Sequence, residues 1–318
     1  MIIKLKGARS QDLETALTRW SLTDESGDSA DRASLTLDAD ELDFIPSSGS
    51  EYAITVNGEA RGVFEVSAID EMLHPAKIIV QLSPAKFNIK DPTGFREPRK
   101  KTFPVATVAD VVTAVMQPHG YTVRVDPELA NLATPHLNQN EETDAAFIRR
   151  IAKKFDAVAK PVNRLYIFGK KGNITTLSGG EKRSVSITPK TLLKDTGKIQ
   201  HPSNVRKKGV KASYRETESG VNGEALVGDE PFHFIKEVFT NEAEATERAK
   251  AKLKELSRKG QTFTGKVEGQ AGYFAESVLT LDGFNNPRTG GKWSVDSVTL
   301  SGSRTSYTIS IKATRPKG

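Results

Sequence analysis

The sequence contains no cysteine, and no apolar run in it approaches the roughly 18 residues of a membrane-spanning helix. Without cysteine there is no disulfide, no thiolate metal ligand and no cysteine nucleophile. Residues 1–6 alternate apolar and basic side chains and lack the apolar centre of a secretion signal, which is typical of a first strand. We therefore expect no membrane span, and stability that comes from packing or oligomerisation.

Aromatic residues are sparse at 7%, but 36% of the 318 residues are hydrophobic and 27% are charged. This composition is typical of a globular chain and not of a disordered one. At roughly 100 to 200 residues per domain, the length predicts two or three domains.

The two ends of the chain differ in charge. Residues 1–95 hold 9 basic and 16 acidic side chains, whereas residues 96–318 hold 37 and 24. Such asymmetry is compatible with nucleic-acid or membrane contact. Because the basic residues are scattered and form no long run, we favour docking of one domain on another, or on the opposite-signed face of a neighbouring subunit.

Residues 1–95 are predicted to form a first antiparallel β-barrel domain, within an α+β fold that is mainly β. Apolar residues alternate in 32–37 and in 52–56, as expected of strands with one buried face. Asn57-Gly58 then supplies the positive φ angles of a tight hairpin turn, and the chain returns at once in another strand.

Residues 96–168 are predicted to form a small α+β domain inserted between two similar barrels. Thr107 is an N-cap for a helix whose valines recur at helical spacing as far as Gly120. A second helix is expected over about 143–155, and a strand follows each helix, over 121–125 and over 164–168.

Residues 169–318 are predicted to form the second β-barrel domain, with one long helix over about 241–259. Asn241 is a predicted N-cap, Glu244 completes a capping box, and basic residues crowd the helix end. Alternating strands follow. The pattern of 169–240 is strand-like, but it does not assign those strands to a sheet.

The two strand-rich regions share a motif. Asn57-Gly58 is followed by Gly62-Val63-Phe64-Glu65-Val66-Ser67-Ala68-Ile69, and Asp282-Gly283 by Gly291-Lys292-Trp293-Ser294-Val295-Asp296-Ser297-Val298. Both copies place glycine, an aromatic residue, valine and a branched apolar residue at the same spacing. Any hairpin with a glycine turn would share part of this pattern, and the alternative that we favour is duplication of one barrel.

We predict no catalytic, cofactor-binding or metal-binding residue. The histidines do not pair at metal-ligand spacing, and no glycine-rich turn has the spacing of a phosphate-binding loop. Two acidic clusters lie at an exposed bend and at a helix start, where we expect them to be solvated. The histidines are His74, His119, His136, His201 and His233, and the clusters are Asp38, Asp40, Glu41 and Asp43, and Glu141, Glu142 and Asp144.

Two basic groups are candidates for contact with nucleic acid, either a genome in a central channel or a dedicated site. No aromatic residue is interleaved with the second group, and Phe95 and Phe103 only flank the first, which argues against a dedicated site. The groups are Arg96, Arg99, Lys100 and Lys101, and Arg206, Lys207 and Lys208.

Several segments occur in an order that is more specific than any one of them. These are the helix from Thr107 with the strand to Val125 and residues 126–130, the segment 138–152, the strand 164–168, the late helix over about 241–259, and the turn and strand over 282–295. In this order the chain resembles the late control protein D family of contractile-tail phages. These baseplate hub proteins are related to the hub part of VgrG in type VI secretion. The resemblance covers nearly the whole chain.

The resemblance implies a homotrimeric hub in which each subunit contributes two similar barrels. Three chains then form a pseudo-six-fold ring that joins a hexameric tail tube to a trimeric spike. The implied partners are the chain itself, the tail tube protein, the spike protein and other baseplate or tape-measure components, with DNA passing through a central channel as a further option. The implied location is the virion tail baseplate, assembled in the bacterial host cytoplasm, and no cofactor is implied.

Other classes stay open. The middle α+β region is loosely like small sugar-binding modules in size and pattern. The alternative is therefore a cell-envelope protein of a tail tip that binds peptidoglycan or another carbohydrate. A hydrolase is disfavoured because sequence order brings no base, acid and nucleophile together. We expect a structural protein and not an enzyme.

Overall fold

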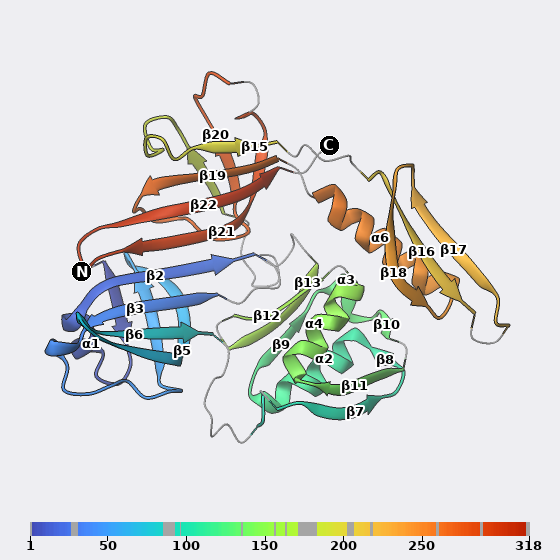
Figure 1. Ribbon diagram of the computed structural model, residues 1–318, viewed down its shortest axis with the longest axis horizontal. Coiled ribbons are helices and arrows are strands. Elements are labelled where there is room, and N and C mark those ends of the chain that lie inside the picture. Colours follow the sequence, from blue (N-terminus) through green and yellow to red (C-terminus); the bar gives the residue numbers. More distant parts are fainter. Residues whose placement is uncertain are drawn as a thin grey trace.

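The computed structural model describes residues 2–26, 31–84, 93–95, 97–134, 136–155, 157–162, 164–170, 183–201, 207–216, 219–258, 261–286 and 289–315. The fold is mainly β, and its largest element is a sheet of twelve strands (Figure 1). Two smaller units that contain helices lie beside this sheet. Within the described ranges, no helix has both the length and the apolar character needed to cross a membrane.

The large sheet takes six strands from each end of the chain. The first six are β1 (Ile3–Lys6), β2 (Leu17–Glu25), β3 (Arg32–Asp38), β4 (Glu51–Val56), β5 (Glu59–Leu73) and β6 (Ala76–Ser83). The other six are β14 (Ser184–Ile187), β15 (Lys198–Gln200), β19 (Gln261–Glu268), β20 (Val278–Leu281), β21 (Lys292–Gly302) and β22 (Tyr307–Arg315). Helix α1 (Ser10–Ala16) and the 3₁₀ turn η1 (Ala39–Glu41) connect strands of the first six.

Both groups of six strands have the same order. It is β1-β4-β5-β6-β3-β2 in the first group and β14-β20-β21-β22-β19-β15 in the second. Taken in chain order, each strand of the second group therefore occupies the place of its counterpart in the first. One difference is that β14 runs parallel to β20, whereas β1 is antiparallel to β4.

A β-bulge also recurs at the same point. The pairing of β5 with β6 shifts register between Val66 and Ala68, and the pairing of β21 with β22 shifts between Val295 and Ser297. These are positions that the repeated sequence motif aligns with each other. Because a bulge adds one residue at a defined site of a strand, its recurrence fixes the correspondence between the two copies residue by residue.

Strands β2 and β21 join the two groups. They pair antiparallel from Trp20 opposite Gly302 to Glu25 opposite Ser297 (Figure 1). Leu22 and Leu300 are opposite each other in this pairing, and both are buried in one hydrophobic core that receives side chains from both groups.

The prediction of a mainly β fold with antiparallel sheets is confirmed. Two closed barrels are not confirmed, because closure is not detected among the described strands and the two groups share one sheet and one core. Alternating apolar residues predict that strands exist, but they do not predict which strand edges pair.

The middle unit contains short sheets and three helices. Its strands are β7 (Arg99–Phe103), β8 (Ala106–Thr107), β9 (Thr122–Val125), β10 (Ala133–Thr134), β11 (Leu137–Glu142), β12 (Ala157–Val162) and β13 (Leu165–Lys170). Its helices are α2 (Val108–Met116), α3 (Pro127–Ala130) and α4 (Asp144–Lys154), with the 3₁₀ turn η2 (Gln117–His119). Thr107 and Asp110 form the capping box of α2, and Thr143 caps α4. A separate hydrophobic core fills this unit.

A second small unit lies between β15 and β19 in the sequence, where the first group has only the short connection from β2 to β3. It consists of β16 (Gly209–Arg215), β17 (Asn222–Gly228), β18 (Phe232–Phe239) and α6 (Glu242–Arg258). Its three strands form their own sheet, and Ala245 and Ala249 of α6 pack on Val210 and Ala212. The long helix predicted for this region is present, but beside a separate sheet. The division of the chain into three domains stays a prediction.

Candidate functional site

The first acidic cluster lies at the surface, beside α1. Asp38 accepts a hydrogen bond from the backbone N–H of Asp40, 3.2 Å away, and so caps η1. Asp43 pairs with Arg9 at 2.6 Å. Asp40, Glu41 and Asp43 are exposed. The carboxylates thus serve a turn and a surface ion pair.

The second acidic cluster is divided between surface and interior. Glu142 pairs with Arg150 and Glu141 with Lys100 at the surface. Asp144, however, is only 4% exposed, so the prediction that this cluster is solvated is wrong for that residue. Its position at the start of α4 was predicted correctly, but the packing of η2 and β11 over that helix end was not visible in the local pattern.

Asp144 is the centre of a buried hydrogen-bond network. Its Oδ2 accepts from His119 Nε2 at 2.7 Å and its Oδ1 accepts from Gln139 Nε2 at 2.7 Å. Arg99 Nε lies 3.4 Å from the same carboxylate. Because a carboxylate only accepts, Nε2 of His119 carries a proton, and Nδ1 can accept from Thr93 Oγ1 at 2.8 Å.

Burial would raise the pKa of Asp144, but the hydrogen bonds from His119 and Gln139 and the charge of Arg99 outweigh it and lower that pKa. A chain of hydroxyl, imidazole and carboxylate has the connectivity of a nucleophilic triad. His119 is 0% exposed, however, and its ring packs roughly perpendicular to the ring of Phe95 with the ring centres 5.1 Å apart. The network therefore acts as a structural tie between the loop at Thr93, β11 and α4.

Other histidines considered in the sequence are dispersed. His74 and His136 are exposed, and His201 is hydrogen-bonded to Gln261 at 2.8 Å. Within the described part of the chain, no three side chains of the metal-ligating types converge on one point. His119 therefore has a structural role in its network.

The first basic group is engaged by neighbours. Arg99 donates to the carbonyl groups of Thr93 and Gly94, Lys100 pairs with Glu141 at 2.9 Å, and Lys101 lies over the ring of Phe103. These contacts are those of a folded surface and do not form an open phosphate-binding patch. Arg96 and Arg206 lie outside the described residues, and Lys207 and Lys208 are exposed.

Ion pairs connect the acidic first 95 residues with the basic remainder. Lys160 is 5% exposed, donates to the carbonyl of Glu25 and lies 3.8 Å from Asp31. Arg164 pairs with Glu51 at 2.8 Å, and Arg183 pairs with Glu59 at 3.1 Å. The uneven charge of the sequence therefore has one physical outcome within the chain, which is docking of oppositely charged parts.

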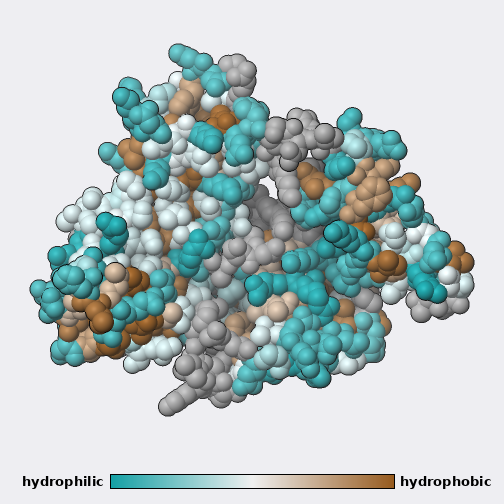
Figure 2. All heavy atoms as spheres, in the orientation of Figure 1, coloured by the Kyte–Doolittle hydropathy of each residue, from teal (hydrophilic) through white to brown (hydrophobic). Residues whose placement is uncertain are grey.

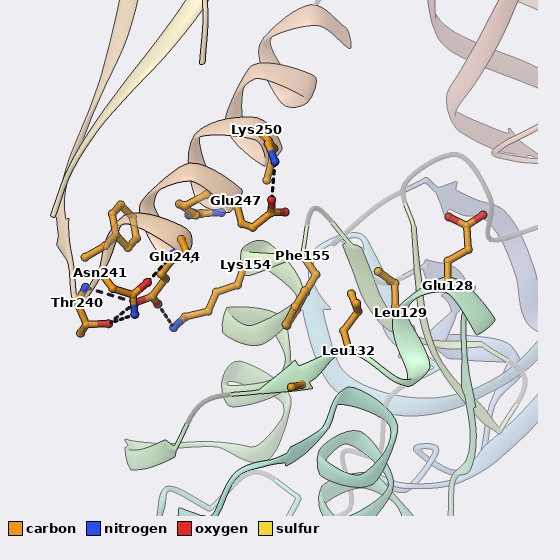
Figure 3. A pocket seen from close by; sticks show the side chains of 15 residues that line it. Glu128, Leu129, Leu132, Lys154, Phe155, Thr240, Asn241, Glu244, Glu247 and Lys250 are labelled. Atoms are coloured by element: carbon orange, nitrogen blue, oxygen red, sulfur yellow. Dashed lines mark hydrogen bonds and ion pairs between the residues drawn. The ribbon is translucent and has the colours of Figure 1, made fainter. Parts of the chain in front are cut away.

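A groove of about 600 Å³ separates the middle unit from α6 (Figure 3). Leu129, Leu132 and Phe155 line it from the side of α3 and α4. Lys154 of α4 reaches towards Glu244 of α6, with its Nζ 3.2 Å from the carboxylate. The groove has an apolar floor beside this ion pair.

The charged rim of the groove is internally paired. Glu244 accepts from Thr240 Oγ1 at 2.8 Å as well as from Lys154, and Glu247 pairs with Lys250 at 2.8 Å. Burial would raise the pKa of Glu244, but these bonds and the charge of Lys154 lower it. The rim thus holds α6 against the middle unit.

Among the described residues, exposed apolar side chains gather on β17 and β18 and at the end of β5. Leu226, Phe234 and Val238 lie on β17 and β18, where the sheet is not covered by α6, and Figure 2 shows hydrophobic atoms at the surface over this unit. Met72 is 44% and Leu73 is 91% exposed at the end of β5, where β5 turns into β6. Such positions are typical of surfaces that contact another protein.

The edge of β5 opposite β6 is open over its last residues. Strand β4 pairs with Glu59 to Glu65, and in the described structure no strand pairs with that edge beyond this point. Asp70 and Glu71 are exposed there. β15, at one end of the large sheet, likewise has a partner on one side within the described residues, which is β19. Open edges present unpaired backbone groups to a further strand.

No protein-family model matches the chain. The chain is 22% identical to a protein of Escherichia phage P2 named probable baseplate hub protein, over 95% of this chain and 89% of that protein. It is 20% identical to the protein of the same name from Escherichia phage 186, over 95% and 90% of the two chains.

Solved structures of tail proteins have a similar fold. The 43 kDa tail protein of prophage MuSo2 from Shewanella oneidensis matches with a TM-score of 0.70 and 14% identity over 99% of both chains. A tail protein from Neisseria meningitidis MC58 matches with a TM-score of 0.69 and 12% identity, over 99% of this chain and 96% of that one.

A third match is an E. coli component of the type VI secretion system, described as structurally similar to the T4 bacteriophage tail proteins gp27 and gp5. It has a TM-score of 0.59 and 13% identity, over 99% of this chain and 77% of that one. Together with the two phage relatives, these structures confirm the resemblance to baseplate hub proteins that the sequence predicted.

Proposed function

We propose that this relative of phage baseplate hub proteins is itself a structural hub, a homotrimer that forms a pseudo-six-fold ring between a hexameric tail tube and a trimeric spike. The observation that carries the proposal is the strand order that occurs twice in one chain. A ring with six similar positions is obtained from three chains only if each chain supplies two comparable units. In this proposal, each group of six strands is one such unit.

The ring has two faces, and we assign the tube protein to one and the spike protein to the other. Other baseplate or tape-measure components would bind at the same hub, in the virion tail baseplate. Support comes from the phage relatives, which are named as baseplate hub proteins, and from the fold, which is that of phage tail proteins and of a type VI secretion component. The names of these relatives describe structural components, in agreement with a role that is not enzymatic.

The three-domain division belongs to the same proposal. The first and last parts would form the ring, and the middle unit, with the unit of β16–β18 and α6, would lie beside it. The alternative of carbohydrate binding stays a prediction. The groove beside α6 does not favour it, because four of the charged side chains that line it form two ion pairs, Lys154 with Glu244 and Lys250 with Glu247.

Multi-angle light scattering of the purified protein tests the proposal. The expected mass is about three times that of the 34.7 kDa chain, and projection images of the same particles should show a ring with three-fold symmetry. A particle that stays monomeric at all concentrations, or a ring of six full chains, contradicts it.

A further inference from the structure

The junction inside the chain uses only part of β21. Strand β20 pairs with its first residues, from Lys292 to Ser294, and β2 pairs with its last, from Ser297 to Gly302. Thr23 and Thr299 are opposite each other in this junction, and their hydroxyl oxygens are 3.1 Å apart. A strand at the edge of one six-stranded group is thus added to the second half of a central strand in the other group.

The same half of the equivalent strand is open in the first group. β5 corresponds to β21, and β4, which corresponds to β20, covers β5 only as far as Glu65. Counting from the shared bulge, Asp70 corresponds to Thr299 and Glu71 to Leu300. Leu300 is 0% exposed beneath the junction, whereas Glu71 is exposed. The first group therefore has the receiving edge of a junction, but no strand from its own chain is added to it in the described structure.

The donating strand also has a counterpart. β15 stands where β2 stands, and the pairing of Ile199 with Phe263 on β19 takes the place of the pairing of Leu22 with Ala33 on β3. It follows that Gln200 corresponds to Thr23. β2 is covered on both sides, whereas the outer edge of β15 has no partner among the described strands.

We infer that β15 of one chain pairs antiparallel with the last residues of β5 in a second copy of the chain, by the geometry of the internal junction. In this register Gln200 lies opposite Asp70, and Lys198 lies opposite Met72. The inference rests on the proposed ring and identifies the contact between its subunits. Each chain then has one internal and one external junction of the same kind, as six similar positions around a ring require.

The chemistry of the two edges is complementary. Lys198 is exposed on β15 and Lys194 in the turn before it, and Asp70 and Glu71 are exposed at the end of β5. Diagonal neighbours on paired strands are within reach of long side chains, so Lys198 can reach Asp70. The exposed Leu73 would lie close to the added strand. A second copy of the chain therefore fits this edge by backbone pairing, charge and apolar contact.

A competing arrangement is end-to-end pairing of β15 with β1, the strand at the opposite end of the large sheet. Lys4 is exposed on β1. The internal junction argues against this pairing, because β14, the counterpart of β1, does not receive β2. The same pairing would also bring Lys198 close to the basic side chains of β1, where like charges oppose association.

Because the chain has no cysteine, engineered pairs report contacts without background. Asp70→Cys with Gln200→Cys is expected to form disulfides between chains on mild oxidation, and so to give covalent species of up to three chains on a non-reducing gel. Thr23→Cys with Thr299→Cys, at the equivalent internal positions, is the matched control and should form a disulfide within one chain. Directly opposed residues on paired strands have the Cα separation that a disulfide needs.

The outcomes separate the junction from the ring. If the particles contain three chains and the internal control oxidises, but Asp70→Cys with Gln200→Cys stays unlinked, the proposed contact between β15 and β5 is wrong. The proposed ring is then not contradicted. Linkage between chains by Lys4→Cys with Gln200→Cys overturns the junction in favour of end-to-end pairing. Particles that remain monomeric overturn both.

A charge exchange gives an independent measurement on surface residues. Lys198→Glu should weaken association by about tenfold, because it replaces an attraction by a repulsion of like charges and the change is repeated at each of the three contacts of a closed ring. Adding Asp70→Lys should restore most of the loss. Analytical ultracentrifugation measures both, and an effect of Lys198→Glu that Asp70→Lys does not reverse contradicts the pairing.

Discussion

Replacing Asp144 with alanine removes the acceptor at the centre of the buried network of the middle unit. The change leaves the Nε2–H of His119 without its partner and removes the charge beside Arg99. The same change strands a second buried donor, one N–H of the side-chain amide of Gln139. A stranded buried donor costs about 1–3 kcal/mol, so with two of them we expect the free energy of unfolding of the middle unit to fall by about 2–6 kcal/mol. Asp144→Asn keeps one acceptor oxygen and should cost about 1–3 kcal/mol.

Glu142→Ala is the matched control, since Glu142 lies two residues away. Its ion pair with Arg150 is partly exposed, with 21% and 43% of the two side chains accessible. Such pairs contribute about 0–1 kcal/mol, so this variant should unfold almost as the parent does.

The assay must report on the middle unit by itself. Both tryptophans, Trp20 and Trp293, lie in the large sheet, so their fluorescence follows the sheet and not this unit. Hydrogen exchange of the amides of α4, measured across a urea titration, follows the middle unit directly. If Asp144→Ala cost no more than Glu142→Ala, the assignment of the network as a structural tie would be wrong.

Other predictions concern pH, the internal junction and salt. Burial, with the nearby charge of Asp24 adding to it, raises the pKa of Asp31 from 3.8 to about 6 despite the opposing charge of Lys160, so the folded protein binds this proton more tightly than the unfolded chain. The chain should be about 1.4 kcal/mol more stable at pH 5 than at pH 7.5, and Asp31→Asn should abolish that gain in urea titrations at the two pH values. Leu300→Ala in the internal junction should cost about 2–5 kcal/mol, seen as a lower urea midpoint by tryptophan fluorescence, and a loss under 1 kcal/mol would argue that the junction is loosely packed. Association of the chains should weaken from low to high salt in light scattering, and an unchanged mass would exclude the electrostatic contribution.

Features that depend on neighbouring residues could be predicted from the sequence. Thr107 and Asn241 were predicted as helix caps, and each accepts a hydrogen bond from the backbone three residues ahead. The helix predicted over about 241–259 is α6, Glu242–Arg258. In the predicted capping box, the carboxylate of Glu244 binds Thr240 in place of the Asn241 backbone, a shift of one residue.

Features that depend on distant residues could not be predicted. Asp144 and His119 are 25 residues apart, and each belongs to a local pattern that is normally exposed, a helix start and a turn. The pairing of Trp20 with Gly302 joins strands nearly the whole chain apart, and alternation carries no information about it. The repeat could be detected because its turns and aromatic residues have the same spacing in both copies. The pairing of β2 with β21, which joins the copies, has no local sequence pattern that predicts it.

The two equivalent central strands, β5 and β21, differ in the side chains that they present at the junction positions. Where β2 covers β21, the buried positions are Val298 and Leu300, while the corresponding positions on β5 are Ile69 and the charged Glu71. A strand surface that is buried when its own chain folds can be apolar without causing aggregation. A strand edge that stays exposed to solvent until a second chain binds needs polar side chains, because an exposed apolar edge would aggregate. In the proposed ring, Asp70 and Glu71 keep the open edge of β5 soluble until the basic strand of a second chain pairs with it. The junction within a chain would then be permanent, whereas the junction between chains would form only on assembly.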